Sequence, residues 1–304
     1  MSDSLTLSVS SPDEAREPFL RLVARAALVD GQQPFNDQAL VDLGKGDRSL
    51  LLAERDGSTL VGAAVIGQGE LEFVIDPEWR EEGLGKQLLD IVLANSDGAL
   101  LAWAHGDHPA SRRLAATHRF DAVRTLLQLR RELPSASGSG SDAPLPPLPE
   151  GFTVSTFRGG RDVDEWVALN ARVFAEHDEQ GGLTADDLRF RMSEAWFEPD
   201  DFLLLRDDAG RLVGYNWLKV EPDDPRVGEI YVIGIEEGHA GQGLGRALMH
   251  HGLRRLIARG CAQAALFVDA DNVRAVELYR SLGFTDHTID VQYLQRGRMR
   301  APRP

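Results

Sequence analysis

Two glycine-containing loops carry residue types suited to holding phosphate groups. Each follows a predicted strand and precedes a predicted helix, with Gly83 and Gly85 in one loop and Gly241, Gly243 and Gly245 in the other. A loop of this kind exposes several backbone N–H groups at the helix N-terminus, where phosphate oxygens are stabilised. Glycine is also a common turn residue, so one loop alone could be structural. Two loops at corresponding places favour the binding interpretation.

The elements around the loops repeat along the chain, which predicts a duplication. A predicted β-hairpin containing Leu60-Val61-Gly62 precedes the first loop, and one containing Leu212-Val213-Gly214 precedes the second. Apolar spacing then predicts helices and a short buried strand in the second copy. Both copies are therefore expected to be mixed α/β domains. The further matched or predicted segments are Glu70–Ile75 with Gly228–Ile233, Arg119-Phe120 with Gly283-Phe284, the helices 245–259 and 272–282, and the strand 264–268.

Length and composition fit two folded domains joined by a linker. The chain has 304 residues, about twice a typical domain, with 42% hydrophobic and 27% charged residues. Residues 134–151 are rich in proline, glycine and serine, which favours a linker. We therefore expect domains at 1–133 and 152–304. The single cysteine, Cys261, excludes an internal disulfide and a cysteine-type zinc site, and it favours a reducing cytoplasm.

The charge balance restricts the partners. The net charge is -15, which repels nucleic acid and anionic membranes at long range. No run approaches the roughly 18 apolar residues of a membrane span, and the start of the chain has no apolar signal core. The sequence thus predicts a cytoplasmic protein, expected to be a monomer, with small-molecule ligands and no metal. His105 and His108 lie in a predicted loop and lack a second set of metal ligands.

The two loops resemble the acyl-CoA pyrophosphate loop of the GNAT acetyltransferase superfamily. Residues 80–85 and 240–245 match its pattern, and Asn272, Ala275, Leu278, Tyr279 and Gly283-Phe284 resemble its second cofactor element. A dinucleotide-binding loop would need a third glycine at another spacing, after the first strand. Ala240 stands where the first copy has Arg80. The resemblance implies acetyl-CoA contacts at Ile233, Gly234, Ile235, Ala240, Gly241, Gln242, Gly243, Leu244, Gly245, Arg246, Asn272, Val273, Arg274, Ala275, Val276 and Glu277, and in the first copy at Phe73, Val74, Ile75, Arg80, Gly83 and Gly85.

Acetyl transfer from a thioester to an amine needs a base and benefits from an acid. A carboxylate, directly or through a water, can take the amine proton, and a proton donor can assist the leaving thiolate. Glu229, in the strand before the loop, is the candidate base; Tyr279, in the position of the superfamily's acid, is the candidate acid. A surface carboxylate and a core tyrosine are the alternative interpretations.

The first copy lacks this pair. Counting back from Phe120 puts Ala115 opposite Tyr279, and His108 opposite Asn272, while Glu70 or Glu72 could imitate Glu229. We expect the first copy to bind acetyl-CoA at most and not to catalyse.

Further segments resemble one family of tandem GNAT enzymes, the mycothiol synthases of actinobacteria. They are residues 174–182, 195–200, 214–220 and 228–232, with Trp103-Ala104-His105-Gly106 in the first copy. The resemblance implies acetylation of the cysteinyl amine of a cysteinyl-glucosaminyl-inositol. Another amine acceptor and a non-catalytic acetyl-CoA sensor remain the alternatives. The resemblance implies substrate contacts at Asp37, Glu179, Lys219 and Glu229, with Phe267 lining the substrate site.

Overall fold

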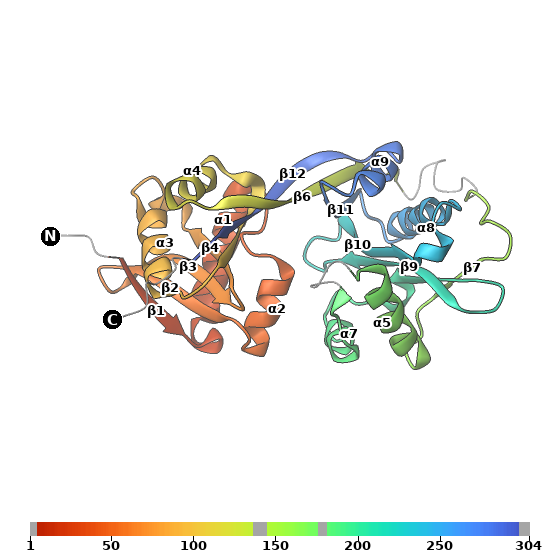
Figure 1. Cartoon of the computed structure of the whole chain (residues 1–304), viewed down its shortest axis with the longest axis horizontal. Helices are drawn as coiled ribbons and strands as arrows, with labels where there is room; N and C mark the ends of the chain where they lie inside the picture. Colours follow the sequence, from red (N-terminus) through yellow and green to blue (C-terminus); the bar gives the residue numbers. More distant parts are fainter. Residues whose placement is uncertain (1–4, 136–144, 176–180, 298–304) are drawn as a thin grey trace. The chain divides into compact units, whose positions relative to one another are not determined.

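The computed structural model describes residues 5–135, 145–175 and 181–297, and they form two compact units (Figure 1). Unit 1 comprises residues 5–127, 269–271 and 288–297, and unit 2 comprises residues 128–135, 145–175, 181–268 and 272–287. The boundaries expected at residues 133 and 152 remain a prediction, and residues 136–144 of the expected linker lie outside the described part. Residues 128–133 belong to unit 2, and residues 288–297 belong to unit 1.

The sheet of unit 1 is antiparallel except at one strand pair. The strand order is β1-β2-β3-β4-β5-β12, and β4 and β5 are parallel. The expected hairpin is confirmed as β2 and β3. The strand next to β5 is β12, which follows unit 2 in the sequence: Val291–Gln295 of β12 pair with Leu100–Ala104. The strands are β1 (Leu5–Ser10), β2 (Ser49–Arg55), β3 (Thr59–Gly67), β4 (Glu70–Ile75), β5 (Leu100–Ala104) and β12 (Thr285–Gln295).

Alternating residues of the unit 1 strands form two apolar clusters on opposite faces of the sheet. Leu71 packs with Leu84 and Leu88 of α3, whereas Val74 packs with Phe19 and Leu43 of α1 and α2. This alternation is what a strand buried on both faces requires. The helices are α1 (Pro12–Asp30), α2 (Asp37–Lys45), α3 (Leu84–Asn95) and α4 (Pro109–His118), with short turns η1 (Pro77–Trp79) and η2 (His105–Asp107).

Unit 2 repeats this arrangement. Its strand order is β11-β10-β9-β8-β7, with β10 and β11 parallel and the other described pairs antiparallel. All nine residues of β9 are buried, as expected for a central strand covered on both faces. The elements are β7 (Thr153–Thr156), β8 (Phe202–Arg206), β9 (Leu212–Val220), β10 (Val227–Ile235), β11 (Gln263–Asp269), α5 (Arg161–Val173), α7 (Ala185–Met192), α8 (Leu244–Ala258), α9 (Val273–Ser281), η3 (Pro199–Asp201) and η4 (Glu237–His239); β6 (Asp121–Glu132) runs from unit 1 into unit 2.

Different side chains fill the two faces of the unit 2 sheet. Figure 1 shows α8 on one side of β9 and β10, and α5 with α7 on the other. The α5 side holds an aromatic cluster in which Trp166, Phe202 and Trp217 are fully buried, and the rings of Phe202 and Trp217 stack at 4.5 Å. The α8 side is aliphatic, with Leu244 and Leu248 against Val213. The predicted second-copy helices and strand are confirmed as α8, α9 and β11.

The matching strands β4 and β10 differ by one inserted residue. Ile75 faces Gly62, and Ile235 faces Gly214, so Ile75 corresponds to Ile235. The match of Glu70–Ile75 with Gly228–Ile233, made from the sequence, paired Ile75 with Ile233 and is wrong at this residue. The register of β10 shifts between Ile230 and Val232, which makes Tyr231 a bulge; the register of β4 has no such shift. A bulge bends a strand and redirects its side chains.

Candidate functional site

The two parallel strands of unit 2 separate next to the bulge. Residues of β10 pair with β11 as far as Ile230 and Leu266, and β10 then continues to Ile235 paired with β9. The edge of β10 that faced β11 is thereby released over Tyr231–Ile235, which includes the predicted contacts Ile233, Gly234 and Ile235. Backbone N–H and C=O groups on a released edge can bond an extended amide-containing ligand, or can donate to a carbonyl oxygen.

The glycine loop forms the start of α8. Gly241 and Gly243 have φ angles of 81° and 80°, a backbone conformation that side chains other than glycine rarely adopt. Gly243 is the N-cap of α8 and has no side chain to cap the helix, so the first N–H groups of Leu244, Gly245 and Arg246 point out of the helix end. Such an end binds anions.

A cation from α9 lies beside this loop. A Cβ atom added at Gly241 would lie 4.0 Å from Nη2 of Arg274. The helix α9 begins next to Asn272, whose side-chain oxygen accepts a hydrogen bond from the backbone N–H of Ala275 at 3.2 Å. The predicted second cofactor element therefore places a guanidinium group next to the predicted pyrophosphate loop. Val273 and Glu277 are exposed on the same helix, while Val276 is buried.

Tyr279 lies in the last turn of α9 and is nearly buried. Its ring meets the ring of Phe284 edge to face, with 6.2 Å between the centroids. Burial raises the pKa of the Tyr279 hydroxyl to about 12. The hydroxyl therefore keeps its proton at neutral pH, as a proton donor must.

Glu229 and Lys219 are direct neighbours across β10 and β9. Lys219 is only 7% exposed, and its ammonium nitrogen lies 5.4 Å from the ring centre of Trp196 and 5.6 Å from that of Tyr231. The same nitrogen lies 2.8 Å from Glu221. Aromatic faces and carboxylates both stabilise an ammonium group, so this site accommodates positive charge next to Glu229.

The other predicted substrate residues are Phe267, Asp37 and Glu179. Phe267 is 41% exposed on β11, just beyond the last residue paired with β10. Asp37 is the first residue of α2 in unit 1 and is exposed. Glu179 falls outside the described residues.

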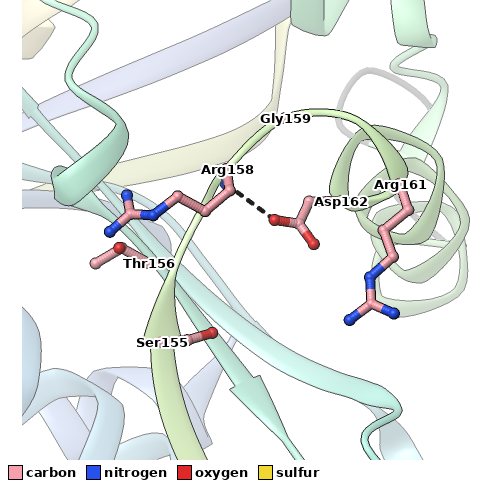
Figure 2. A pocket seen from close by; sticks show the side chains of 6 residues that line it. All are labelled: Ser155, Thr156, Arg158, Gly159, Arg161 and Asp162. Carbon is pink, nitrogen blue, oxygen red and sulfur yellow. Dashed lines mark hydrogen bonds between the residues drawn. The ribbon is translucent and has the colours of Figure 1, made fainter.

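A pocket of about 400 Å³ opens elsewhere in unit 2, at the start of α5 (Figure 2). Asp162 accepts a hydrogen bond from the backbone N–H of Arg158 at 2.9 Å, and its other oxygen pairs with Arg206. The charged residues of this pocket are thus paired with neighbours that do not line it. The lining residues, which include none of the predicted site residues, are Ser155, Thr156, Arg158, Gly159, Arg161 and Asp162.

Comparisons with known proteins fit the geometry of unit 2. Residues 166–284 match the family model described as "Acetyltransferase (GNAT) family". The chain is 46% identical over 290 residues to a protein named mycothiol acetyltransferase from Clavibacter sepedonicus, covering 93% of this chain and 92% of the relative. It is 41% identical over 300 residues to one of the same name from Kocuria rhizophila, covering 94% and 96%. The chain belongs to the mycothiol acetyltransferase family.

Solved structures support the fold of this family member. A tandem GNAT protein from the clavulanic acid biosynthesis pathway superposes with a TM-score of 0.75 at 15% identity, covering 98% of this chain and all of that one. A GCN5-related N-acetyltransferase from Sphaerobacter thermophilus gives 0.68 at 21% identity, covering 97% and 96%. The expectation of duplicated GNAT domains with a mixed α/β fold is confirmed. Among the described residues, no helix has the length and apolar character to cross a membrane, and no cluster suited to a metal ion was found.

The loop of unit 1 in this acetyltransferase differs from that of unit 2 in charge. Gly83 caps α3 with a φ angle of 81°, but Glu81, with a φ angle of 66°, stands where unit 2 has Gly241. The guanidinium of Arg80 is bonded to both carboxylate oxygens of Asp30, at 2.6 and 2.8 Å. Arg80 is therefore paired within unit 1, and a carboxylate has replaced a glycine beside the predicted phosphate position. Phe73, Val74, Ile75 and Gly85 occupy β4 and the first turn of α3.

The residues of unit 1 that correspond to the predicted catalytic pair, Glu229 and Tyr279, also differ. Glu70 faces Gly67 as Glu229 faces Lys219, so Glu70, not Glu72, corresponds to Glu229. The Phe120 N–H bonds the carbonyl of Ala115 as the Phe284 N–H bonds that of Tyr279, which confirms Ala115 as the counterpart of Tyr279.

Some residues of the site were not identified from the sequence of this acetyltransferase. Arg191, which is buried on α7, donates from Nε to the Tyr231 hydroxyl at 3.0 Å. No sequence pattern signals this contact, because Arg191 lies in a helix far along the chain from the bulge. The sequence also did not predict the partners of His105. Each of its two ring nitrogens lies within hydrogen-bond distance of a carboxylate.

Proposed function

We propose that this chain transfers the acetyl group of acetyl-CoA to the cysteinyl amine of the cysteinyl-glucosaminyl-inositol, giving mycothiol and CoA. The observation that carries the proposal is the 46% identity, over nearly the full length of both chains, to a mycothiol acetyltransferase. A cytoplasmic location and a monomeric state remain predictions from the sequence.

The proposed chemistry assigns one role to each of two side chains. Glu229 takes a proton, directly or through a water, from the amine as its nitrogen attacks the acetyl carbonyl. Tyr279 gives its proton to the sulfur as the carbon–sulfur bond breaks, and its pKa of about 12 suits that role. Backbone N–H groups on the released edge of β10 are positioned to donate to the carbonyl oxygen as negative charge develops there.

Binding roles follow from charge. The N-terminus of α8 and the adjacent Arg274 support a pyrophosphate site, despite the net charge of -15. Lys219 and Glu229 are proposed substrate contacts, together with Asp37, Glu179 and Phe267. Lys219 is a donor suited to hydroxyl groups of a sugar or an inositol.

Unit 1 is proposed to be non-catalytic. The carboxylate of Glu70 lies 2.6 Å from the guanidinium of Arg48, so one of its oxygens is bonded to a cation, which lowers its tendency to take a proton. Ala115 offers no proton donor, and β4 lacks the bulge found in β10.

The deciding experiment measures CoA formation by chromatography, because the acceptor carries its own thiol and would react with thiol reagents. The full chain, with acetyl-CoA and the cysteinyl-glucosaminyl-inositol, is expected to form CoA and one acetylated amide. Glucosamine, an aminoglycoside and a peptide with a free N-terminus serve as comparison amines. Equal turnover of these amines would sink the specific assignment, and acetyl-CoA binding without turnover of any amine would favour a sensor.

A further inference from the structure

A buried charge network in unit 1 ties four distant parts of the chain together. His105 lies between two carboxylates, with Nδ1 2.9 Å from Asp290 and Nε2 3.1 Å from Glu72. Asp290 also accepts from the backbone N–H of Gly106 at 2.9 Å. Glu72 is 0% exposed and Asp290 is 7% exposed. A buried ion network of this kind is costly unless its geometry is fixed.

The other end of the network holds the start of α2. Glu72 accepts from the backbone N–H of Asn36 at 2.8 Å and from the side-chain amide of Asn36 at 2.7 Å. Asn36 is the N-cap of α2, and its side-chain oxygen accepts from the backbone N–H of Ala39 at 2.7 Å. One carboxylate therefore fixes both the backbone and the side chain of the residue that precedes Asp37.

The same strand also holds the far end of α2. Glu70 and Glu72 point to one face of β4, and Arg48 joins Glu70 at 2.6 Å to Asp42 at 3.1 Å. Asp42 belongs to α2, so the helix is held near its start by Glu72 and near its end through Arg48. Fixing both ends leaves little freedom for the first residue of the helix.

We propose that Glu72 is a positioning residue that fixes Asn36 and so orients the Asp37 carboxylate toward the amine substrate. Glu72 is itself held by His105, which Asp290 binds in turn. The substrate half of this proposal rests on the proposed function, in which Asp37 contacts the cysteinyl-glucosaminyl-inositol. The orienting half rests on the contacts within unit 1 alone.

Two variants of the full chain test it. Asp290→Asn removes the charge that holds His105, and Asp290 is linked to Asn36 only through His105 and Glu72 in this network. Asn36→Ser keeps a good helix cap but removes the amide donor to Glu72, and it is mild enough to preserve the fold. Asp90→Asn is the matched control, because Asp90 also pairs with a histidine, His118, at 2.9 Å, and its other partner is Lys86 of its own helix α3.

Both test variants are expected to raise KM for the cysteinyl-glucosaminyl-inositol by about 3- to 10-fold, with kcat and the KM for acetyl-CoA within about twofold. In an Asp37→Ala background the same changes are expected to add nothing, because their effect passes through Asp37. Hydrogen exchange at Ala39–Asp42 is expected to be faster in both test variants and unchanged in Asp90→Asn.

Each other result counts against the proposal. Unchanged exchange at the start of α2 in folded Asn36→Ser and Asp290→Asn overturns the orienting role. A KM effect that persists in the Asp37→Ala background overturns the route through Asp37, as does an Asp37→Ala variant with unaltered KM. Failure of the wild-type chain to acetylate this amine would refute the proposed function, whereas the exchange results would still decide the orienting role.

Discussion

Arg48 lies 2.6 Å from Glu70, the residue of unit 1 whose cross-strand position matches that of Glu229 in unit 2. The two glutamates occupy equivalent places in duplicated strands but have different neighbours. Glu229 lies beside a lysine held among aromatic rings, whereas Glu70 is bonded to a buried arginine that also binds a helix. The duplicated position thus holds a structural ion pair in one unit and is proposed to serve catalysis in the other.

Replacing each of these two glutamates should show which unit catalyses the reaction. Glu229→Gln is expected to lower kcat by about 10²- to 10⁴-fold, the usual contribution of a general base, while acetyl-CoA binding persists. Glu70→Gln, the matched change in unit 1, is expected to leave kcat within about threefold. Steady-state rates and acetyl-CoA titrations check both. A large loss of kcat in a folded Glu70→Gln variant would contradict the proposed division of labour.

Tyr279→Phe should affect turnover more than binding. Loss of the proton donor is expected to lower kcat by about 10- to 100-fold, with the KM for acetyl-CoA nearly unchanged. Because burial raises the pKa of Tyr279 to about 12, its ionisation should not reduce kcat until the pH approaches that value. Tyr215→Phe is the control, since Tyr215 is fully buried and its hydroxyl donates to Asn170 at 2.7 Å. Equal losses in kcat and in acetyl-CoA affinity for Tyr279→Phe would indicate a packing role.

Arg274→Gln should weaken acetyl-CoA binding selectively. The guanidinium lies beside Gly241, so its loss is expected to raise the KM for acetyl-CoA by about 3- to 10-fold, most clearly at low ionic strength. Arg280→Gln, on the same helix, is the control, because Arg280 pairs with Asp286 at 3.1 Å. Similar effects of the two variants would show that α9 contributes only general positive charge.

The stability of unit 1 should fall at alkaline pH. Burial alone would lower the pKa of His105, but its hydrogen bonds to Asp290 and Glu72 and their charges raise the pKa from 6.5 to about 9. Arg48, a charged group of the same network, lies 3.9 Å from Glu72. The protonated ring stabilises the fold fully below pH 6.5, and this contribution is lost as the pH rises through about 9.

Thermal unfolding of the wild type and of His105→Gln checks this from pH 6 to pH 10. The difference in midpoint is expected to be largest near pH 6 and to shrink above pH 9. A difference that grows with pH would contradict the assignment of a protonated His105.

Local patterns in the sequence predicted much of the fold and part of the site. The loop at Gly241 and Gly243 and the helix after Asn272 could be predicted because their signals lie within a few residues. The bulge at Tyr231 could not, since one inserted residue in a strand leaves no compositional trace. The pairing of His105 with Asp290 was equally hidden, because the two residues are 185 positions apart and neither belongs to a motif.

The strand β12 also sets the order in which the protein can be completed on the ribosome. Residues 288–297 belong to unit 1 but are translated after every described residue of unit 2. During synthesis, His105 therefore lacks Asp290, and the edge of β5 lacks its partner strand, until residues 288–297 have been made. An unpaired strand edge can pair with another chain, so the growing chain can aggregate through the edge of β5 until β12 has been made.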